Sequence, residues 1–321
     1  MSFKNVYHPL VTVAMVTYNS QDYARMAMES VLASSYENFE LIICDDCSKD
    51  DTWSIIGEYN DQRIRAFRNE TNIGEYPNRN KCIDLAQGKY FLFIDGDDLI
   101  LPHGLETYVR YAESFSNIGL VIQKGYFNNL IFPIVLEKED IFDWEFNRKS
   151  LLTSSLTSNF FVTDVLQKVG KLSVDFINSD DEIRYRLALK YPVLFIPGWL
   201  TWPRETPGQA SSRLSGGRGQ LESFKMLNKI VKDETSPALI DAFRQQNTRN
   251  RQVLARFALK HLLKGNVKSY RDIRQVTDMG FFELIRFSLS RSNIEVIPEQ
   301  EYDPSKPLHN FDHIRSFKYV E

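Results

Sequence analysis

The chain is short of cysteine and of long apolar runs. Only three of its 321 residues are cysteine, which is too few for a disulfide framework and fits a reducing compartment. No apolar stretch approaches the roughly 20 residues that cross a bilayer, and no charged-then-apolar signal begins the chain. These absences predict a protein that is made and kept in the cytoplasm.

Motifs for zinc, redox and triad chemistry are scarce too. Cys44 and Cys47 form a C-x-x-C pair, but no second Cys or His pair follows at the spacing of a zinc site. The five histidines form no convincing Ser-His-Asp or Cys-His arrangement. The sequence therefore gives little support to zinc, redox or triad chemistry.

Charge is unevenly distributed, although the net charge is only -3. Residues 1–212 contain 20 Lys and Arg against 29 Asp and Glu, whereas residues 213–292 contain 16 against 7. A basic segment beside an acidic body points to an anionic partner such as a membrane surface, although a solvated basic helix face has the same composition. Within it, Arg251 to Lys264 has one apolar and one cationic stripe, which suits either packing on the protein's own core or an anionic membrane.

The first half alternates short apolar runs with amphipathic stretches, which predicts βαβ units and a mostly parallel sheet flanked by helices. Strands are expected at Val11 to Thr17, Phe39 to Cys44 and Tyr90 to Ile94, with weaker ones at Ile64 to Phe67 and Leu120 to Gln123, and helices at Tyr23 to Leu32 and Asn78 to Ala86. Asp22 is a candidate cap for the first helix, and Asp50 or Asp51 for the next.

The second half is less regular at its start. Phe127 to Ser155 lacks clean periodicity and is interpreted as irregular, substrate-facing structure. A helix over Asp180 to Leu189, a strand over Val193 to Ile196 and a mobile loop over Thr206 to Ser212 are expected next, followed by helices over Leu221 to Val231, Pro237 to Lys264 and Gly280 to Ser290.

Three carboxylates follow the third apolar strand within four positions, at Asp95, Asp97 and Asp98. Such a cluster repels itself unless a cation lies among the oxygens, so it predicts a hard divalent metal and, through it, a phosphate-bearing ligand. The alternative is a plain turn, since Asp and Gly tolerate turn conformations. Position favours the metal, because open α/β sheets bind ligands beyond the carboxyl ends of their strands.

A second acidic pair, Asp45 and Asp46, closes the expected strand over Phe39 to Cys44. A carboxylate there can accept from the N–H groups of a nucleobase. The first strand contributes Thr17, Tyr18 and Asn19 at its own end. Arg79 is placed to neutralise a diphosphate, or else to pair with a nearby acid.

Six motifs then occur in unbroken order over roughly residues 9–110. They are Val11 to Asn19, Asp45-Asp46-x-Ser48, Asn72-x-Gly74, Arg79-Asn80, Ala86-x-Gly88-x-Tyr90, and Asp95-x-Asp97-Asp98 with Pro102. Together they resemble the nucleotide-sugar half of family 2 glycosyltransferases. The resemblance implies an α/β GT-A fold, a UDP, GDP or dTDP sugar donor, a Mg²⁺ or Mn²⁺ ion and inversion at the anomeric carbon.

The same resemblance implies residue roles. Asp46 would meet the base, Asp95 the ribose, Asp97 the ribose or the metal, and Asp98 the metal. The family's carboxylate base near a helix start would fall on Asp180, with Asp181 as the alternative because Ser179 replaces the usual preceding acid. If the resemblance is set aside, the alternative role of Asp180 is to cap the helix. Thr206 stands where many members have a histidine that approaches the metal.

The whole chain is thus interpreted as a catalytic domain over residues 1–212, with a donor half at about 9–110 and an acceptor half at about 111–212, and a basic, mainly helical region over 213–321. The expected acceptor is a glycan or lipid-linked glycan of bacterial surface polysaccharide, with the protein in the cytoplasm and peripheral at the inner face of the cell membrane. No nucleic-acid partner is expected. The rivals are a nucleotide-sugar-binding module without turnover and a nucleotidyltransferase, although the latter usually begins with a Gly-rich, basic phosphate loop.

Overall fold

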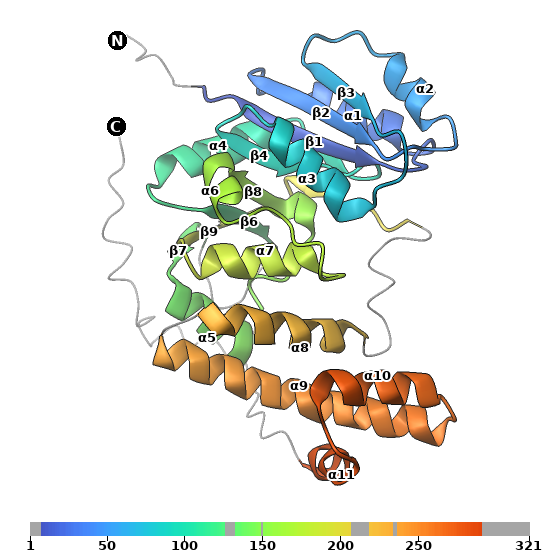
Figure 1. The fold of residues 1–321 in the computed structure, drawn as a ribbon. Coiled ribbons are helices and arrows are strands. Elements are labelled where there is room, and N and C mark those ends of the chain that lie inside the picture. The colour runs from blue at the N-terminus through green and yellow to red at the C-terminus, as the bar shows by residue number, and fades with distance from the viewer. Residues whose placement is uncertain (1–7, 126–131, 149, 207–217, 234–235, 291–321) are drawn as a thin grey trace.

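The computed structural model describes residues 8–125, 132–148, 150–206, 218–233 and 236–290 (Figure 1). Its centre is an eight-stranded sheet in the order β3-β2-β1-β4-β8-β6-β9-β7, and a two-stranded ribbon joins β10 to β5. The predicted mostly parallel α/β sheet is confirmed. β8 runs antiparallel to β4 and β6, and β7 runs antiparallel to β9, while the other pairs of the large sheet are parallel.

The first half follows the expected alternation of strand and helix. Its elements are β1 Val11–Thr17, α1 Ala24–Leu32, β2 Phe39–Asp45, α2 Thr52–Gly57, β3 Ile64–Arg68, α3 Glu75–Leu85, β4 Tyr90–Phe93, β5 Leu99–Ile100 and α4 Gly104–Ser114. All five strands expected up to residue 124 are present, including β6 Leu120–Lys124.

Both faces of this sheet are buried, which is why its strands read as continuous apolar runs. Along β1, Ala14 belongs to one core cluster, whereas Val13 and Met15 belong to the other. The cluster with Val13 includes side chains of α1, α2 and α4, and the cluster with Ala14 includes side chains of α3, α6 and α7. Helices therefore cover the sheet on both sides.

The expectation of irregular structure between Phe127 and Ser155 is wrong for the residues described there. β7 Ile134–Leu136 and α5 Lys138–Asn147 lie in this stretch. Ile141, Phe142 and Phe146 of α5 are buried, so tertiary packing determines this helix although its sequence periodicity is weak. The remaining elements of this half are β8 Asn159–Val162, α6 Thr163–Lys168, α7 Ser179–Ala188, β9 Val193–Pro197 and β10 Thr201–Trp202.

The α-helices described beyond β10 are α8 Arg218–Ile230, α9 Pro237–Leu263, α10 Val267–Thr277 and α11 Phe281–Leu289. In Figure 1, α7 lies between the sheet and α8, and α10 and α11 lie farthest from the sheet. The expected loop over Thr206 to Ser212 and the expected boundary at residue 212 fall in residues 207–217, outside the described residues apart from Thr206. No helix in the described part of the chain has the length and apolarity of a membrane span.

The apolar stripe of Arg251 to Lys264 packs inside the protein. Leu254 and Ala258 have no exposed surface and belong to a core shared with Tyr270 of α10 and Leu284 of α11. Of the two alternatives for this stripe, packing is confirmed. α9 also reaches the main core through Phe243, whose ring centroid lies 5.1 Å from that of Phe142.

Two capping expectations need correction. α1 begins at Ala24 with Tyr23 as its N-cap, and no side chain caps it, so Asp22 does not serve there. Asp51 is the N-cap residue of α2 but makes no side-chain cap bond. Asp50 instead accepts the backbone N–H of Thr52 at 3.1 Å, which ties this carboxylate to the first residue of α2.

Candidate active site

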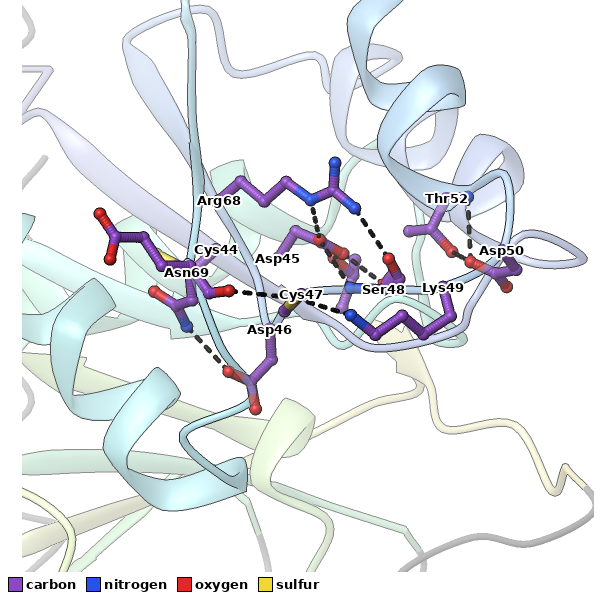
Figure 2. A network of polar contacts seen from close by, with 12 residues as sticks. Cys44, Asp45, Asp46, Cys47, Ser48, Lys49, Asp50, Thr52, Arg68 and Asn69 are labelled. Carbon is purple, nitrogen blue, oxygen red and sulfur yellow. Dashed lines mark hydrogen bonds and ion pairs between the residues drawn. The ribbon is translucent and has the colours of Figure 1, made fainter.

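The carboxyl ends of β1 and β2 are joined through Asp45, which is fully buried. Its carboxylate accepts the Thr17 hydroxyl at 3.0 Å, the backbone N–H and hydroxyl of Ser48 at 3.0 and 2.5 Å, and forms an ion pair with Arg68 at 3.5 Å (Figure 2). Its side chain has no exposed surface. The structure therefore places Asp45 behind the strand ends, where it holds the turn, and away from any ligand-facing surface.

Asp46 lies beside it and faces the opposite way, toward the loop that begins α3. Its Oδ1 accepts the side-chain amide of Asn69 at 2.9 Å and the backbone N–H of Ile73 at 2.8 Å, and its Oδ2 accepts the backbone N–H of Gly74 at 2.9 Å. Gly74 has φ 93°, a conformation that favours glycine. This turn starts α3 at Glu75, three residues before the expected Asn78.

A pocket of about 460 Å³ opens at these strand ends. Its lining residues are Val16, Thr17, Tyr18, Asp46, Asn72, Gly74, Glu75 and Asn78. The structure thus brings together three of the predicted nucleotide-binding residues, Thr17, Tyr18 and Asp46, and adds Glu75, which sequence reasoning missed. Tyr18 is half exposed, with a free aromatic surface at the rim.

Asn19 lies next to the pocket without lining it. It has φ 51°, donates its backbone N–H to the Ser48 hydroxyl at 2.9 Å and accepts the backbone N–H of Lys49 at 2.8 Å. These bonds join the end of β1 to the turn after β2. Asn19 therefore supports the pocket wall through the backbone.

Arg79 and Asp95 meet in a bidentate ion pair, with 2.5 and 2.8 Å between their nitrogens and oxygens. Glu75 adds a second carboxylate at 3.2 Å, and the guanidinium lies over the Phe93 ring at 5.4 Å. Of the two alternatives for Arg79, the structure gives the pairing with an acid. Arg79 fixes α3 to the loop that follows β4, and its charge is matched within the protein.

Asp97 and Asp98 differ sharply in environment. Asp98 is buried, and its carboxylate accepts the Thr157 hydroxyl and the backbone N–H of Arg204, the latter at 2.9 Å. Burial raises the pKa of Asp98 to about 7, and the negative charges of Asp95 and Asp97 add to this shift. Asp97 is half-buried and accepts the Thr206 hydroxyl at 2.8 Å.

Thr206, which stands where many members of the resembled family have a histidine, thus contacts the acidic loop directly. Among the described residues, no group of three or more His, Cys, Asp or Glu side chains is arranged to hold a metal ion. The site offers the carboxylate oxygens of Asp97 and Asp98, which suit a hard cation.

Asp180 and Asp181 lie in the first turn of α7, whose N-cap is Asn178. The cap interpretation of Asp180 is therefore wrong, because this residue is already helical. Both carboxylates bind Nη2 of the fully buried Arg184, Asp180 at 3.2 Å and Asp181 at 2.5 Å. Burial raises the pKa of Asp181, with the Arg184 charge opposing the shift and the Asp180 charge adding to it.

Tyr76 connects this helix to the pocket. It neighbours Glu75 on α3, accepts the backbone N–H of Ser179 at 3.1 Å, and donates its hydroxyl to the Ile177 carbonyl at 2.5 Å. Burial, then the negative charges of Asp180 and Glu75, raise the pKa of the Tyr76 phenol. The start of α7 is therefore held against the start of α3, on which two pocket residues lie.

The family relationship follows from comparison with known proteins. Residues 12–163 match the model of glycosyl transferase family 2. Over this segment, a little under half of its length, the chain is similar to family 2 glycosyltransferases. The matched segment contains β1 to β8 and therefore the Asp46 pocket and the acidic loop.

Curated proteins match a little over a third of this chain. The chain is 35% identical over 121 residues to UDP-Glc:alpha-D-GlcNAc-diphosphoundecaprenol beta-1,3-glucosyltransferase WfaP of Escherichia coli, covering 36% of this chain and 48% of WfaP. It is 38% identical over 127 residues to the putative teichuronic acid biosynthesis glycosyltransferase TuaG of Bacillus subtilis, covering 37% and 50%. The chain spans about half the length of the curated relatives it matches.

Solved structures extend the likeness in fold over most of the chain. S. aureus TarS 1-349 in complex with UDP-GlcNAc superposes with a TM-score of 0.60 at 16% identity, covering 83% of this chain and 90% of TarS. The mannosyltransferase PcManGT from Pyrobaculum calidifontis, in complex with GDP-Man and Mn2+, gives 0.59 at 15% identity, covering 92% and 89%. The predicted GT-A-like fold is thereby confirmed.

A first prediction concerns the titration of Asp98. Its folded-state pKa of about 7 is above the ordinary 3.8, so without a cation the folded protein loses stability as pH rises from the lower value through the higher one. Asp98→Asn removes this titration. In chelator-treated samples the variant should gain stability over the wild type between about pH 5 and about pH 8, by up to a few kcal/mol, measured by thermal unfolding. Identical pH dependence of the two proteins would contradict the buried-charge account.

Proposed function

We propose that the protein is a metal-dependent, inverting glycosyltransferase that moves a sugar from a nucleoside-diphosphate sugar to an acceptor hydroxyl in bacterial surface polysaccharide or glycan biosynthesis. The observation that carries the proposal is the Asp46 pocket at the strand ends, whose lining residue Val16 accepts the backbone N–H of Gly96 in the acidic loop at 3.1 Å. In open α/β sheets this edge is where ligands bind. The catalytic part would comprise residues 1–212, and residues 213–321 would form a basic helical region.

Three residues of the pocket suit the nucleoside end of the donor. Tyr18 offers an aromatic face for the base, Asp46 a carboxylate acceptor and Thr17 a hydroxyl. The solved TarS and PcManGT complexes contain UDP-GlcNAc and GDP-Man, which supports a UDP, GDP or dTDP sugar here. Asp95, fixed by Arg79, would face the ribose, and Arg79 would act by positioning Asp95.

Asp97 and Asp98 fit a hard divalent cation, Mg²⁺ or Mn²⁺. Burial and then the negative charges of Asp95 and Asp97 raise the pKa of Asp98, and a cation among the carboxylates would offset this by favouring the charged form. When bound, such an ion would supply positive charge against the charge that builds on the leaving diphosphate. Arg204 and Thr157 orient Asp98, and Thr206 orients Asp97, by the hydrogen bonds described above.

Asp180 is the proposed general base, with Asp181 as the alternative. The Asp180 side chain is 32% exposed and bonded to Arg184 at 3.2 Å, whereas Asp181 has the closer 2.5 Å contact and a second one from Asn178. Asp180 is thus the less constrained of the two. It would take the proton from the acceptor hydroxyl as that oxygen attacks the sugar carbon, and a single displacement of this kind inverts the anomeric centre.

The acceptor is proposed to be a glycan or a lipid-linked glycan. The name of WfaP states a diphosphoundecaprenol-linked acceptor, and that of TuaG states teichuronic acid biosynthesis. Two rivals make different predictions. A binding module would need no base at Asp180, and a nucleotidyltransferase would release pyrophosphate from a nucleoside triphosphate.

An anionic membrane surface is proposed as a further partner, which would place the protein in the cytoplasm, at the inner face of the cell membrane. The relevant feature is the α9–α10 tip, defined here as Lys260, Leu263, Lys264, Val267 and Lys268. All five are exposed, and Leu263 is exposed by 88%. Apolar side chains among cations suit the interface of an anionic bilayer.

The donor prediction tests the central proposal. A nucleoside-diphosphate sugar with Mn²⁺ should stabilise the wild type, by about 2.7 kcal/mol at a hundredfold excess over Kd, read as a rise in Tm across a panel of UDP, GDP and dTDP sugars. Tyr18→Ala should lose most of this rise because it removes the exposed ring of the pocket. Phe282→Ala, which also removes an exposed aromatic ring but on α11, is the matched control. If no member of the panel raises the Tm of the wild type, the proposed function is wrong.

The base prediction separates transfer from binding. Asp180→Asn should lower kcat by about a hundredfold to ten-thousandfold, because the amide cannot accept the acceptor's proton, while the donor-induced Tm rise persists. Turnover is followed as acceptor-dependent release of nucleoside diphosphate. Asp181→Asn should be less affected. The reverse order would assign the base to Asp181, and full activity in both variants would remove α7 from the mechanism.

The membrane prediction compares two triple variants of equal charge. Lys260→Gln, Lys264→Gln and Lys268→Gln together should reduce pelleting with anionic liposomes at low salt, since each cation near such a surface contributes about 1 kcal/mol. The control replaces the exposed Lys168, Lys190 and Lys232 with Gln. Equal pelleting of both variants, or none of the wild type, would refute the tip as a membrane contact.

A further inference from the structure

Two tryptophans are strongly exposed on the segment that follows β9. The side chain of Trp199 is 77% exposed and that of Trp202 is 65% exposed. Tryptophan carries a large apolar surface, and exposed apolar surface of this size is a mark of ligand or partner recognition. Neither residue has a place in the donor pocket, whose lining lies at β1, β2 and α3.

Trp202 is adjacent to the acidic loop. It lies on β10, directly across from Leu99 of β5, and Leu99 follows Asp98 in the chain. Cross-strand partners project from the same face of a ribbon. Two residues after Trp202, the backbone N–H of Arg204 bonds to the Asp98 carboxylate at 2.9 Å. The indole is thus attached to the same small ribbon that holds the proposed metal-binding carboxylate.

Trp199 lies over the end of β6. A Cβ placed on Gly125 would be 3.7 Å from Cζ2 of Trp199, which is van der Waals contact, so the indole covers this glycine. The residue before it, Gly198, has φ 148°, and its backbone N–H bonds to the Lys124 carbonyl at 3.3 Å. Trp199 therefore projects beyond the carboxyl edge of the sheet, the same edge at which the acidic loop lies.

Hydrogen bonds from buried parts of the protein fix the backbone between the two tryptophans. The buried Gln123 accepts the backbone N–H of Leu200 at 2.7 Å and donates to the Thr201 hydroxyl at 2.5 Å. The Leu200 carbonyl accepts the backbone N–H of Leu101 at 2.8 Å. Leu200 and Thr201 are buried while the residues on either side are exposed. Two large aromatic side chains on a rigid, hydrogen-bonded support form a pre-organised surface.

We propose that Trp199 and Trp202 form an aromatic platform that binds pyranose rings of the acceptor glycan, beside the carboxylates that serve the donor. This inference rests on the proposed glycosyltransferase function. A pyranose has an apolar face of C–H groups and a rim of hydroxyls, so it stacks on an indole while its hydroxyls stay hydrated. Trp202 pairs with Leu99, the residue after Asp98, so the platform lies beside the proposed metal site. The attacking sugar has to approach the reacting carbon from outside the donor pocket, so the expected occupant is the acceptor.

The binding test uses the indoles as reporters. The wild type and Trp144→Phe, which removes a tryptophan of α5, should show a change in indole fluorescence when titrated with a panel of octyl glucoside, galactoside, mannoside and N-acetylglucosaminide below their micelle concentrations. At least one glycoside should also protect the indoles from iodide quenching. Trp199→Ala with Trp202→Ala should abolish both effects. Failure of every glycoside on the wild type, or an unchanged response in the double variant, would overturn the platform.

The kinetic test separates this proposal from the function on which it rests. Trp202→Ala should raise the acceptor KM about tenfold, the change expected for about 1.4 kcal/mol of lost contact, with kcat and the donor-induced Tm rise retained. Trp202→Phe should restore much of the acceptor KM because an aromatic face returns. A normal donor response with an unchanged acceptor KM would refute the platform alone. Absence of the donor response in the wild type would refute the glycosyltransferase proposal itself.

Concentration-dependent dimerisation that the double alanine variant abolishes, without any glycoside response, would assign the surface to a second copy of the chain.

Discussion

The clamp that Asp46 places on the loop before α3 is the constraint on which the rest of the site depends. Three donors from residues 69–74 converge on this one carboxylate, two of them backbone N–H groups. Hydrogen bonds to a charged acceptor are stronger than neutral ones, and a buried carboxylate left without them would be costly. The end of β2 therefore determines where α3 begins.

Helix α3 in turn contacts the two other parts of the site and so determines where they lie. Through Arg79 it fixes Asp95 and thereby the acidic loop after β4. Through Tyr76 it holds the N-terminal turn of α7, where Asp180 lies. One helix thus sets the spacing between the proposed donor pocket and the proposed base, which are more than 130 positions apart in the chain. Misplacement of α3 would shift all three groups together.

Sequence reasoning succeeded where burial on both faces left an unambiguous signal. The runs at β1, β2 and β4 are apolar throughout because helices cover both sides, and the polar residues that follow them mark the sheet edge. It failed at α5, whose Phe142 packs against Tyr185 and Phe243, both far along the chain, and it did not anticipate α10. Trp199 and Trp202 gave no signal either, because sequence alone does not tell an exposed tryptophan from a buried one.

The consecutive acids show why residue roles are harder to predict than element types. In the extended chain at the end of β2, neighbouring side chains point to opposite sides, so Asp45 turns into the buried strand junction while Asp46 reaches the pocket. The pair on the acidic loop divides in the same way, with Asp98 buried against Thr157 and Asp97 half-buried near Thr206. On α7, Asp181 has the closer contact with Arg184 and Asp180 the looser one. In each doublet one carboxylate is committed more fully to the protein's own hydrogen bonds than the other. That asymmetry follows from backbone direction and burial, which a string of adjacent Asp letters does not record.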